Sequence, residues 1–208
     1  MANRTSALDG QLPGAVLLHT RLLRNAGVLA LLLFLCLPRL VAGEERPRAS
    51  LPRVEAAFLR NFAHYIAWPP SAFADDHAPW RICILGNDPF GRVLDDTLLG
   101  RVEQGRTFAV IRAETLSEAA PCQIIYVAYR TSEGRRAVLA ELKRRPVLTV
   151  GDAPGFLQEG GVIRFHVSDH VEFGVNLDQA RAASLHVQTR MLEVAYEVVE
   201  DGVVRRRR

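Results

Sequence analysis

Short apolar runs alternate with helical stretches through the middle of the chain, and this alternation constrains the fold more than any other feature. A helix with one apolar face is predicted over 133–143. Strands that alternate with helices favour a mainly parallel sheet with helices on both faces. Four runs have the length and composition of buried strands, at residues 81–85, 107–112, 124–128 and 147–150.

The first predicted helix begins after Ser50, a residue type that favours the N-cap position, and has Pro52 in its first turn. It ends before the Pro69-Pro70 pair, because the residue before a proline is disfavoured in the α region. Six apolar residues spaced by three or four positions predict the buried stripe of this helix, namely Val54, Ala57, Phe58, Phe62, Tyr65 and Ile66.

The last third of the chain changes character. Residues 162–167 and 171–175 alternate between apolar and polar side chains, which predicts a half-buried antiparallel hairpin added to the sheet. A short helix is expected over 177–183 and a longer one over 189–199. The predicted fold class is therefore α/β, with a mainly parallel sheet, a C-terminal antiparallel hairpin and helices on both faces.

The N-terminal segment has the pattern of a secretory signal peptide. Arg21 and Arg24 precede an apolar run at 28–37, and the small residues Val41-Ala42-Gly43 follow it. A membrane-spanning helix needs about twenty apolar residues, so this run is too short to span. The pattern therefore predicts export of the rest of the chain.

We expect cleavage between Gly43 and Glu44, which assigns 1–43 to a signal peptide and 44–208 to a single domain. The predicted location of the mature protein is the periplasm. An uncleaved membrane anchor is the alternative. A lipid-attached form is disfavoured, because the residues before Cys36 are too bulky for a lipidation site.

Charge counted on the predicted mature chain argues against nucleic acid as a partner. Four arginines and one aspartate leave with 1–43, so the 26 basic and 23 acidic residues become 22 and 22. Phosphate binding requires a clear positive footprint, which this balance lacks. The arginine run at 205–208 is either a solvated, frayed end or a contact with an anionic membrane surface.

Two cysteines, Cys83 and Cys122, remain after the signal is removed. Cys83 lies inside one strand-like run and Cys122 directly precedes another, so adjacent strands could bring the two sulfurs together. A disulfide would close a loop of about forty residues and stabilise the fold by about 4 kcal/mol. Two buried free thiols are the alternative.

The chain lacks the motifs of common catalytic and metal sites, including G-x-S-x-G, C-x-x-C, H-E-x-x-H and the P-loop. We therefore expect no enzyme, no catalytic residues and no cofactor. His166 and His170 could be considered for zinc. The strand alternation instead places His166 on an outer polar face opposite Glu172, so no metal site is predicted.

Two loops of similar chemistry follow predicted strands, at 86–91 and 151–156, and each contains an aspartate and a proline. Asp88 makes the first loop a poor phosphate cradle, because its carboxylate would repel an anion. Ligands commonly bind at the carboxyl ends of strands in α/β sheets, so a small-ligand receptor is one hypothesis. The aromatic residues on or beside loops are either partner contacts or core side chains, namely Phe73, Phe90 and Phe156.

Four blocks of sequence occur in order across about residues 51–199. They are 54–62 with Trp68-Pro69, 81–86 with 88–91, 145–150 with 152–156, and 160–165 with 175–180. Together these blocks resemble the YfiR-like family of periplasmic regulators of membrane diguanylate cyclases. The positions of Cys83 and Cys122 fit a disulfide of that family, whereas a second family disulfide in the region 154–162 has no cysteines here.

The resemblance implies a non-catalytic inhibitor that represses an inner-membrane diguanylate cyclase and so lowers cyclic di-GMP signalling and biofilm formation. The implied partner is the periplasmic domain of that cyclase. An outer-membrane lipoprotein and a second copy of the chain are further candidate partners. The residues of the partner interface are not predicted by the sequence.

Overall fold

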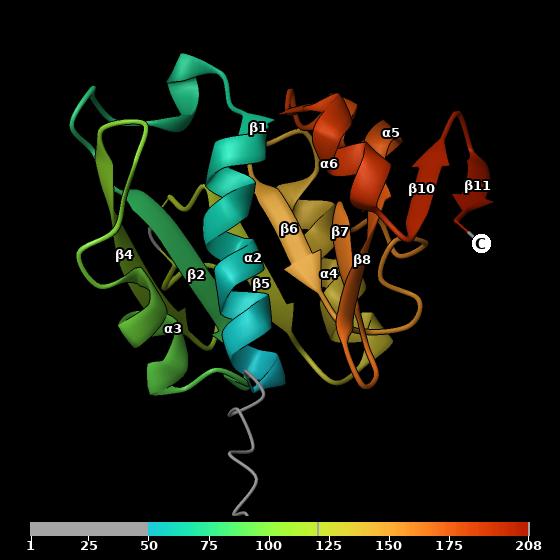
Figure 1. The fold of residues 1–208 in the computed structure, drawn as a ribbon, viewed down its shortest axis with the longest axis horizontal. Helices are drawn as coiled ribbons and strands as arrows, with labels where there is room; N and C mark the ends of the chain where they lie inside the picture. The colour runs from blue at the N-terminus through green and yellow to red at the C-terminus, as the bar shows by residue number, and fades with distance from the viewer. Residues whose placement is uncertain (1–49, 120, 208) are drawn as a thin grey trace, which may run out of the picture. The chain divides into compact units, whose positions relative to one another are not determined.

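A central sheet organises the part of the chain that the computed structural model describes, residues 50–119 and 121–207. Helix α2 (Leu51–Tyr65) covers one face of the sheet and α4 (Ser132–Leu142) covers the other (Figure 1). The predicted signal peptide and its cleavage site at Gly43 and Glu44 lie outside the described residues. Across the described ranges, no helix has the length and apolar character needed to cross a membrane.

The sheet of the described residues contains nine strands in the order β11-β10-β8-β7-β6-β5-β2-β4-β3. The five strands from β4 to β7 in this order are parallel, and β3, β8 and β11 add antiparallel pairs. This arrangement confirms the predicted fold class. The strands are β2 (Trp80–Gly86), β3 (Val102–Glu103), β4 (Arg106–Ala113), β5 (Ile124–Ala128), β6 (Leu148–Gly151), β7 (Ile163–Val167), β8 (Val171–Asn176), β10 (Glu197–Glu200) and β11 (Val203–Arg206).

Short elements complete the fold around this sheet. A second, two-stranded sheet pairs β1 (Ile66–Ala67) with β9 (His186–Val187). The predicted helices over 133–143 and 177–183 are confirmed to within a residue at each end. The remaining helical elements are η1 (Pro70–Ala72), α3 (Arg92–Leu98), α5 (Leu177–Ala182) and α6 (Thr189–Val194).

The chain changes its direction of travel across the sheet between β2 and β5. From β2 it passes through α3 to β4 on one side, and it then returns to β5 on the other side of β2. From β5 it continues through α4 to β6. In open α/β sheets a crevice forms at such a switch point, outside the carboxyl ends of the strands.

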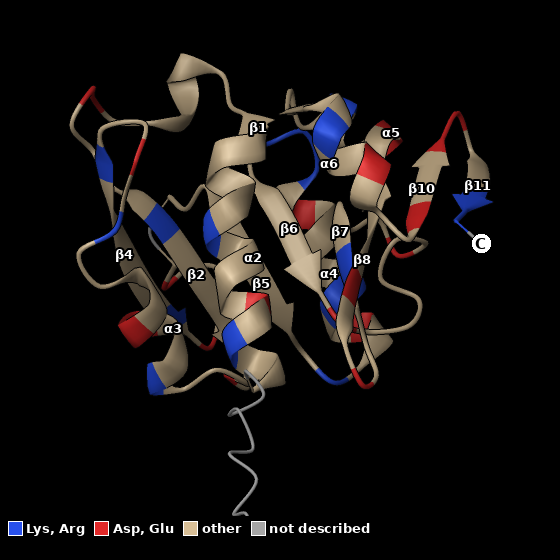
Figure 2. Ribbon diagram, in the orientation of Figure 1, with Lys and Arg blue, Asp and Glu red and all other residues tan. Residues whose placement is uncertain are grey.

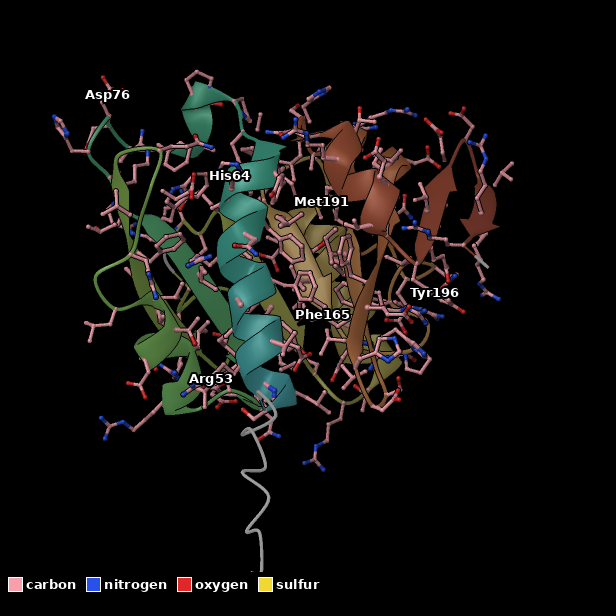
Figure 3. All side chains as sticks on the ribbon, in the orientation of Figure 1. Arg53, His64, Asp76, Phe165, Met191 and Tyr196 are labelled. Carbon is pink, nitrogen blue, oxygen red and sulfur yellow. A yellow bond between two sulfur atoms is a disulfide. The ribbon has the colours of Figure 1, made fainter. Side chains whose placement is uncertain are left out.

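Strand alternation divides the core into two parts. Cys83 and Leu85 of β2 belong to the α4 side, while Ile82 and Ile84 belong to the side covered by α2. On the α2 side, Phe62 stacks on Phe165 of β7 with 5.9 Å between ring centroids, and Met191 of α6 joins the same core (Figure 3). The two apolar layers hold the helices to the sheet.

The buried stripe of α2 differs from the predicted one. Phe62 and Ile66 are buried as expected, but Val54, Ala57, Phe58 and Tyr65 are only half-buried. The helix is rotated about its axis relative to the predicted orientation. As a result Glu55, near its N-terminus, is buried in the core. The fully buried positions of the helix are Glu55, Ala56, Leu59, Phe62 and Ala63.

The predicted helix over 189–199 is wrong beyond Val194. The chain instead forms the hairpin β10–β11, in which Glu200 pairs with Val203. Asp201 and Gly202 between them both have positive φ, 52° and 72°, which suits the tight hairpin turn that an Asp-Gly pair favours. β10 also pairs in parallel with β8 and supplies hydrogen-bond partners to its otherwise open edge.

This hairpin also orders the start of the arginine run at 205–208. Arg205 and Arg206 belong to β11, so the expected frayed end is wrong for these two residues. The Nε atom of Arg206 lies 3.1 Å from Oε2 of the buried Glu197, and Arg205 pairs with Glu200. The positive charge of the Arg206 guanidinium thereby offsets part of the negative charge of the buried Glu197 carboxylate.

A disulfide joins Cys83 to Cys122 on the α4 side of the sheet. Cys83 lies in the middle of β2, while Cys122 lies just before the neighbouring β5, and their Cα atoms are 6.1 Å apart. The family-based prediction of this disulfide is confirmed, and the alternative of two free thiols is wrong. The bond closes a loop with a sequence separation of 39 residues.

Replacing both cysteines in the variant Cys83→Ala/Cys122→Ala is expected to lower the free energy of unfolding by about 2–4 kcal/mol, because the unfolded chain regains the entropy of the open loop. Urea denaturation followed by circular dichroism measures the change. Wild-type protein treated with a reductant should lose a similar amount, and the reductant should leave the double variant unaffected. Equal stability of the oxidised and reduced wild type would contradict the expectation.

Candidate functional site

The aromatic residues considered as partner contacts are mostly core side chains. Phe90 and Phe156 are 3% and 0% exposed, so of the two alternatives the core side chain is the one observed for both. Phe73 is half-buried, packs edge-to-face on Trp80 and carries the guanidinium of Arg106 at 4.0 Å from its ring centre. Phe73 is therefore held by its own fold as well.

The histidines occupy polar surface positions. His166 pairs across the hairpin with Glu172, as the strand alternation predicted, and its ring stacks on Tyr196. The Nδ1 atom of His170 lies 3.0 Å from Asp169, and the carboxylates of Asp169 and Glu172 raise its pKa. Residues 50–119 and 121–207 contain no group of three or more His, Cys, Asp or Glu side chains that could hold a metal ion.

A cleft of about 480 Å³ opens at the carboxyl edge of the sheet, at the switch point between β2 and β5. The loops after β2, β5 and β6 form its walls, so both aspartate–proline loops border it as the sequence predicted. Cavities of this volume are typical of small-molecule sites. The lining residues are Asn87, Pro89, Tyr126, Ala128, Tyr129, Arg130, Arg135, Asp152, Ala153 and Pro154.

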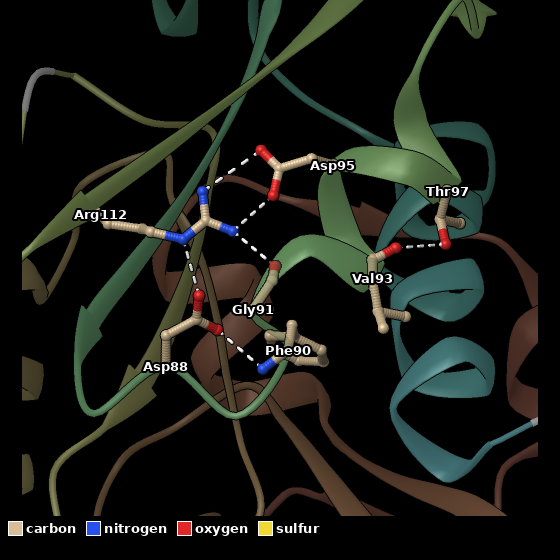
Figure 4. Close-up of polar contacts among 7 residues, drawn as sticks. All are labelled: Asp88, Phe90, Gly91, Val93, Asp95, Thr97 and Arg112. Atoms are coloured by element: carbon tan, nitrogen blue, oxygen red, sulfur yellow. Dashed lines mark hydrogen bonds and ion pairs between the residues drawn. The ribbon is translucent and has the colours of Figure 1, made fainter.

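Ion pairs to Arg112 of β4 hold the loop after β2 in place. The Nε atom of Arg112 donates to Asp88 at 2.6 Å, and its other nitrogens donate to Asp95 and to the carbonyl of Gly91 (Figure 4). The second carboxylate oxygen of Asp88 accepts from the Phe90 backbone N–H at 2.7 Å. Hydrogen bonds to Arg112 also lower the pKa of Asp95. Both carboxylate oxygens of Asp88 therefore accept hydrogen bonds from the protein itself.

The loop after β6 wraps around the buried ring of Phe156. Gly151 and Gly161 approach opposite parts of this ring so closely that a Cβ atom at either position would overlap it. The backbone hydrogen bond from Gly161 to the Phe156 carbonyl, 2.9 Å long, closes the loop. This close approach fixes the backbone that presents Asp152 to the cleft.

A buried ion pair fixes the α4 side of the cleft. Arg135 donates from Nε and Nη2 to the two carboxylate oxygens of Glu159, each at 2.7 Å. Its Nη1 atom donates to the carbonyls of Tyr129 and Arg130. These contacts lower the pKa of Glu159 and occupy the donors of Arg135. The guanidinium of Arg135 thus supports the wall of the cleft.

Tyr126 of β5 lines the cleft from inside the core. Its side chain is 1% exposed, and its ring meets that of Phe90 edge-on with centroids 4.9 Å apart. Burial first, and then the charge of Asp152, raise the pKa of its phenol, so the hydroxyl stays protonated. Among residues 50–119 and 121–207, no hydrogen bond of ordinary geometry reaches the hydroxyl oxygen, although a hydrogen-bonding influence of Asp152 also contributes to the raised pKa. A buried hydroxyl without a partner is uncommon in native proteins.

Glu55 of α2 adds a second buried polar group near Tyr126 and Asp152. It is 6% exposed, and burial followed by the charge of Asp152 raises its pKa from 4.5 to about 7. The sequence analysis missed both Glu55 and Tyr126. Their signal is present in the sequence, since Glu55 stands at helical spacing from Phe58, Leu59 and Phe62, and Tyr126 interrupts an apolar run.

The lining residues of the cleft include no histidine, serine, threonine or cysteine. The fold is a disulfide-linked α/β domain with this cleft at the switch point of its sheet. The chain belongs to the YfiR/HmsC-like family, whose family model matches residues 52–196. No curated protein matches the chain.

The variant Gly161→Ala is expected to lower the free energy of unfolding by about 1–3 kcal/mol, because the added methyl group overlaps the Phe156 ring. Gly155→Ala in the same loop is the matched control, since its new Cβ would have no neighbour closer than 3.6 Å. Urea denaturation of the two variants measures the difference. Equal stabilities would show that Phe156 does not restrain this loop.

Glu55 is expected to make stability decrease as the pH rises. Between pH 4.5 and about 7 the folded protein retains a proton on Glu55 that the unfolded chain has lost, so the free energy of unfolding falls through this window and levels off above it. A shift of the Glu55 pKa from 4.5 to about 7 corresponds to a decrease of about 3 kcal/mol in the free energy of unfolding. We expect about 2 kcal/mol, because the charge of Asp152, which causes part of the shift, is screened by water. Urea denaturation at pH 5, 6, 7 and 8 measures the slope.

Comparison with Glu55→Gln isolates this residue from the other titrating groups. The variant should lack the decrease and should exceed the wild type in stability at pH 8. Glu141→Gln, at an exposed position of α4, should follow the wild-type profile. Identical profiles for wild type and Glu55→Gln would exclude a raised pKa at Glu55.

Proposed function

We propose that this chain is a periplasmic regulatory binding protein that represses an inner-membrane diguanylate cyclase. Repression would lower cyclic di-GMP signalling and biofilm formation. The observation that carries the proposal is membership of the YfiR/HmsC-like family over residues 52–196, since that family is known for regulating diguanylate cyclases. The cyclase's periplasmic domain is the proposed partner. An outer-membrane lipoprotein is proposed as a second partner.

The chemistry of the described residues supports a binding role in the periplasm. The Cys83–Cys122 disulfide is of the kind that forms in oxidising compartments outside the cytoplasm. Basic and acidic residues are interspersed along the ribbon, without a face of one sign in the view of Figure 2. This pattern supports a protein partner more than nucleic acid.

Repression through binding sets a requirement on the affinity of the regulator. To move a cyclase from mostly active to mostly inactive, the regulator must prefer the inactive conformation by about 5 kcal/mol. A preference of this size comes from interactions that only one state of the partner offers. A rigid domain suits this role, since ordering of the regulator on binding would reduce the free energy available.

A small-ligand receptor is the second candidate function. The observation that favours it is the cleft at the switch point, which has the position and volume of ligand sites in α/β proteins. Binding of a metabolite in the absence of any effect on cyclic di-GMP would favour this function over the first.

Deleting the gene is expected to raise cellular cyclic di-GMP and biofilm formation, because the cyclase loses its inhibitor. Cyclic di-GMP extracted from the deletion strain and measured by mass spectrometry tests the expectation. Complementation with the full chain should restore the wild-type level. Unchanged cyclic di-GMP in the deletion strain would reject the proposed role.

Two complementing variants make the test specific. A chain without residues 1–43 should fail to restore repression, because it would remain in the cytoplasm. Glu141→Gln changes an exposed side chain and should restore repression fully. Restoration by the shortened chain would contradict a periplasmic site of action.

A further inference from the structure

We propose that the cleft at the carboxyl ends of β2, β5 and β6 binds a small organic cation, with Asp152 as its charge partner and the Tyr126 hydroxyl as its hydrogen-bond partner. The proposal concerns a ligand site of this chain and does not depend on the regulation of a cyclase. It follows from the position of the cleft, from an unsatisfied buried hydroxyl and from the sign of the surrounding charges.

The Tyr126 hydroxyl indicates that a ligand completes the cleft. The residue lines the cleft but is 99% removed from solvent, since its exposure is 1%. Within the described residues no hydrogen bond of ordinary geometry reaches its hydroxyl oxygen, and the polar side chain that acts on the hydroxyl is the neighbouring Asp152 carboxylate. Leaving such a group unpaired is unfavourable, and a bound donor or acceptor would recover that cost.

The charges around the hydroxyl favour a positively charged ligand. Every charge that shifts the pKa of the Tyr126 phenol belongs to a carboxylate, those of Asp152, Glu55 and Asp88. The guanidinium of Arg130 also lines the cleft, but it is exposed and is not among the charges that act on the phenol. Asp88 is held by Arg112, and Arg135 is held by Glu159. Asp152 is exposed and forms no ion pair with any described Lys, Arg or His. Glu55 is buried and does not line the cleft, so the carboxylate left for a ligand is that of Asp152.

The lining of the cleft favours an organic cation over a metal ion. Pro89, Ala128, Ala153, Pro154 and the ring of Tyr129 contribute apolar surface around Asp152. The described residues contain no group of three or more ligands suited to a metal ion. A protonated amine attached to a small apolar group matches both the Asp152 carboxylate and the apolar lining of the cleft. The ammonium N–H groups would donate to Asp152 and to the phenol oxygen, and the body would contact the prolines.

Three probes of similar size and different charge test the proposal on the full mature chain. Isothermal titration calorimetry at pH 7 compares benzylamine, benzyl alcohol and benzoate. We expect benzylamine to bind at least about tenfold more tightly than the other two, because only it pairs with the carboxylate. Undetectable binding of benzylamine at millimolar concentration, or equal affinity for the alcohol or benzoate, would overturn the proposal.

Two substitutions test whether benzylamine binds at Asp152 and Tyr126. Asp152→Asn should weaken benzylamine at least about tenfold, since it removes the charge without changing the shape. Tyr126→Phe should weaken it about fivefold or more and should leave the melting temperature unchanged or higher, because the unpaired hydroxyl is lost. Retained affinity in both variants would overturn the assignment of the site.

Tyr129→Phe is the matched control within the same cleft. The Tyr129 hydroxyl donates to the carbonyl of Glu114 at 2.5 Å, so it is already partnered. Removing it should lower the melting temperature and should leave the affinity for benzylamine within about twofold of wild type. A loss of affinity in Tyr129→Phe equal to that in Tyr126→Phe would show that the effect is general loosening of the cleft, which would also overturn the proposal. A failure of these tests leaves the cyclic di-GMP measurements unaffected, so the two proposals can be rejected separately.

Discussion

The parallel pairing of β2 with β5 is the contact on which both the disulfide and the cleft depend. Its register runs from Ile82 opposite Ile124 to Gly86 opposite Ala128. At the beginning of this register Cys83 and Cys122 come within bonding reach. At its end the loops after both strands meet at the switch point of the sheet. A slip of one residue would exchange the two faces and would separate the cysteines.

The walls of the cleft are held by interactions that differ in strength. Arg112 joins two carboxylates on the β2 side, but its partly exposed position weakens these ion pairs through solvent screening. Arg135 and Glu159 are largely buried, and their bidentate pairing compensates for lost hydration. The inner end of the cleft is different, because Tyr126 lines it from the core and the buried Glu55 is close enough to Tyr126 to act on it electrostatically. Buried polar groups that break the apolar rule of a core are expected at functional sites.

Most of the central fold was predictable because strand and helix periodicities are local properties. The run 124–128 matches β5 in full, and the Glu172–His166 pair follows from alternation alone. The incorrect helix prediction near the C-terminus has a specific cause. Residues 189–199 have helical spacing, but the open edge of β8 and the Asp201-Gly202 turn favour a hairpin, and tertiary pairing outweighed the local preference. The Asp201-Gly202 pair is itself a hairpin signal in the sequence.

Local residue patterns were sufficient to predict the α/β class, the order of most strands and helices along the chain, the two aspartate–proline loops and the family resemblance. These depend on side-chain period, turn residues and ordered motifs, all of which are properties of neighbouring residues. The rotation of α2 that buries Glu55, the burial of the Tyr126 hydroxyl and the exposed Asp152 carboxylate beside it could be seen only in the folded chain. Those features arise where separate segments meet, because burial and pairing depend on partners distant in the chain.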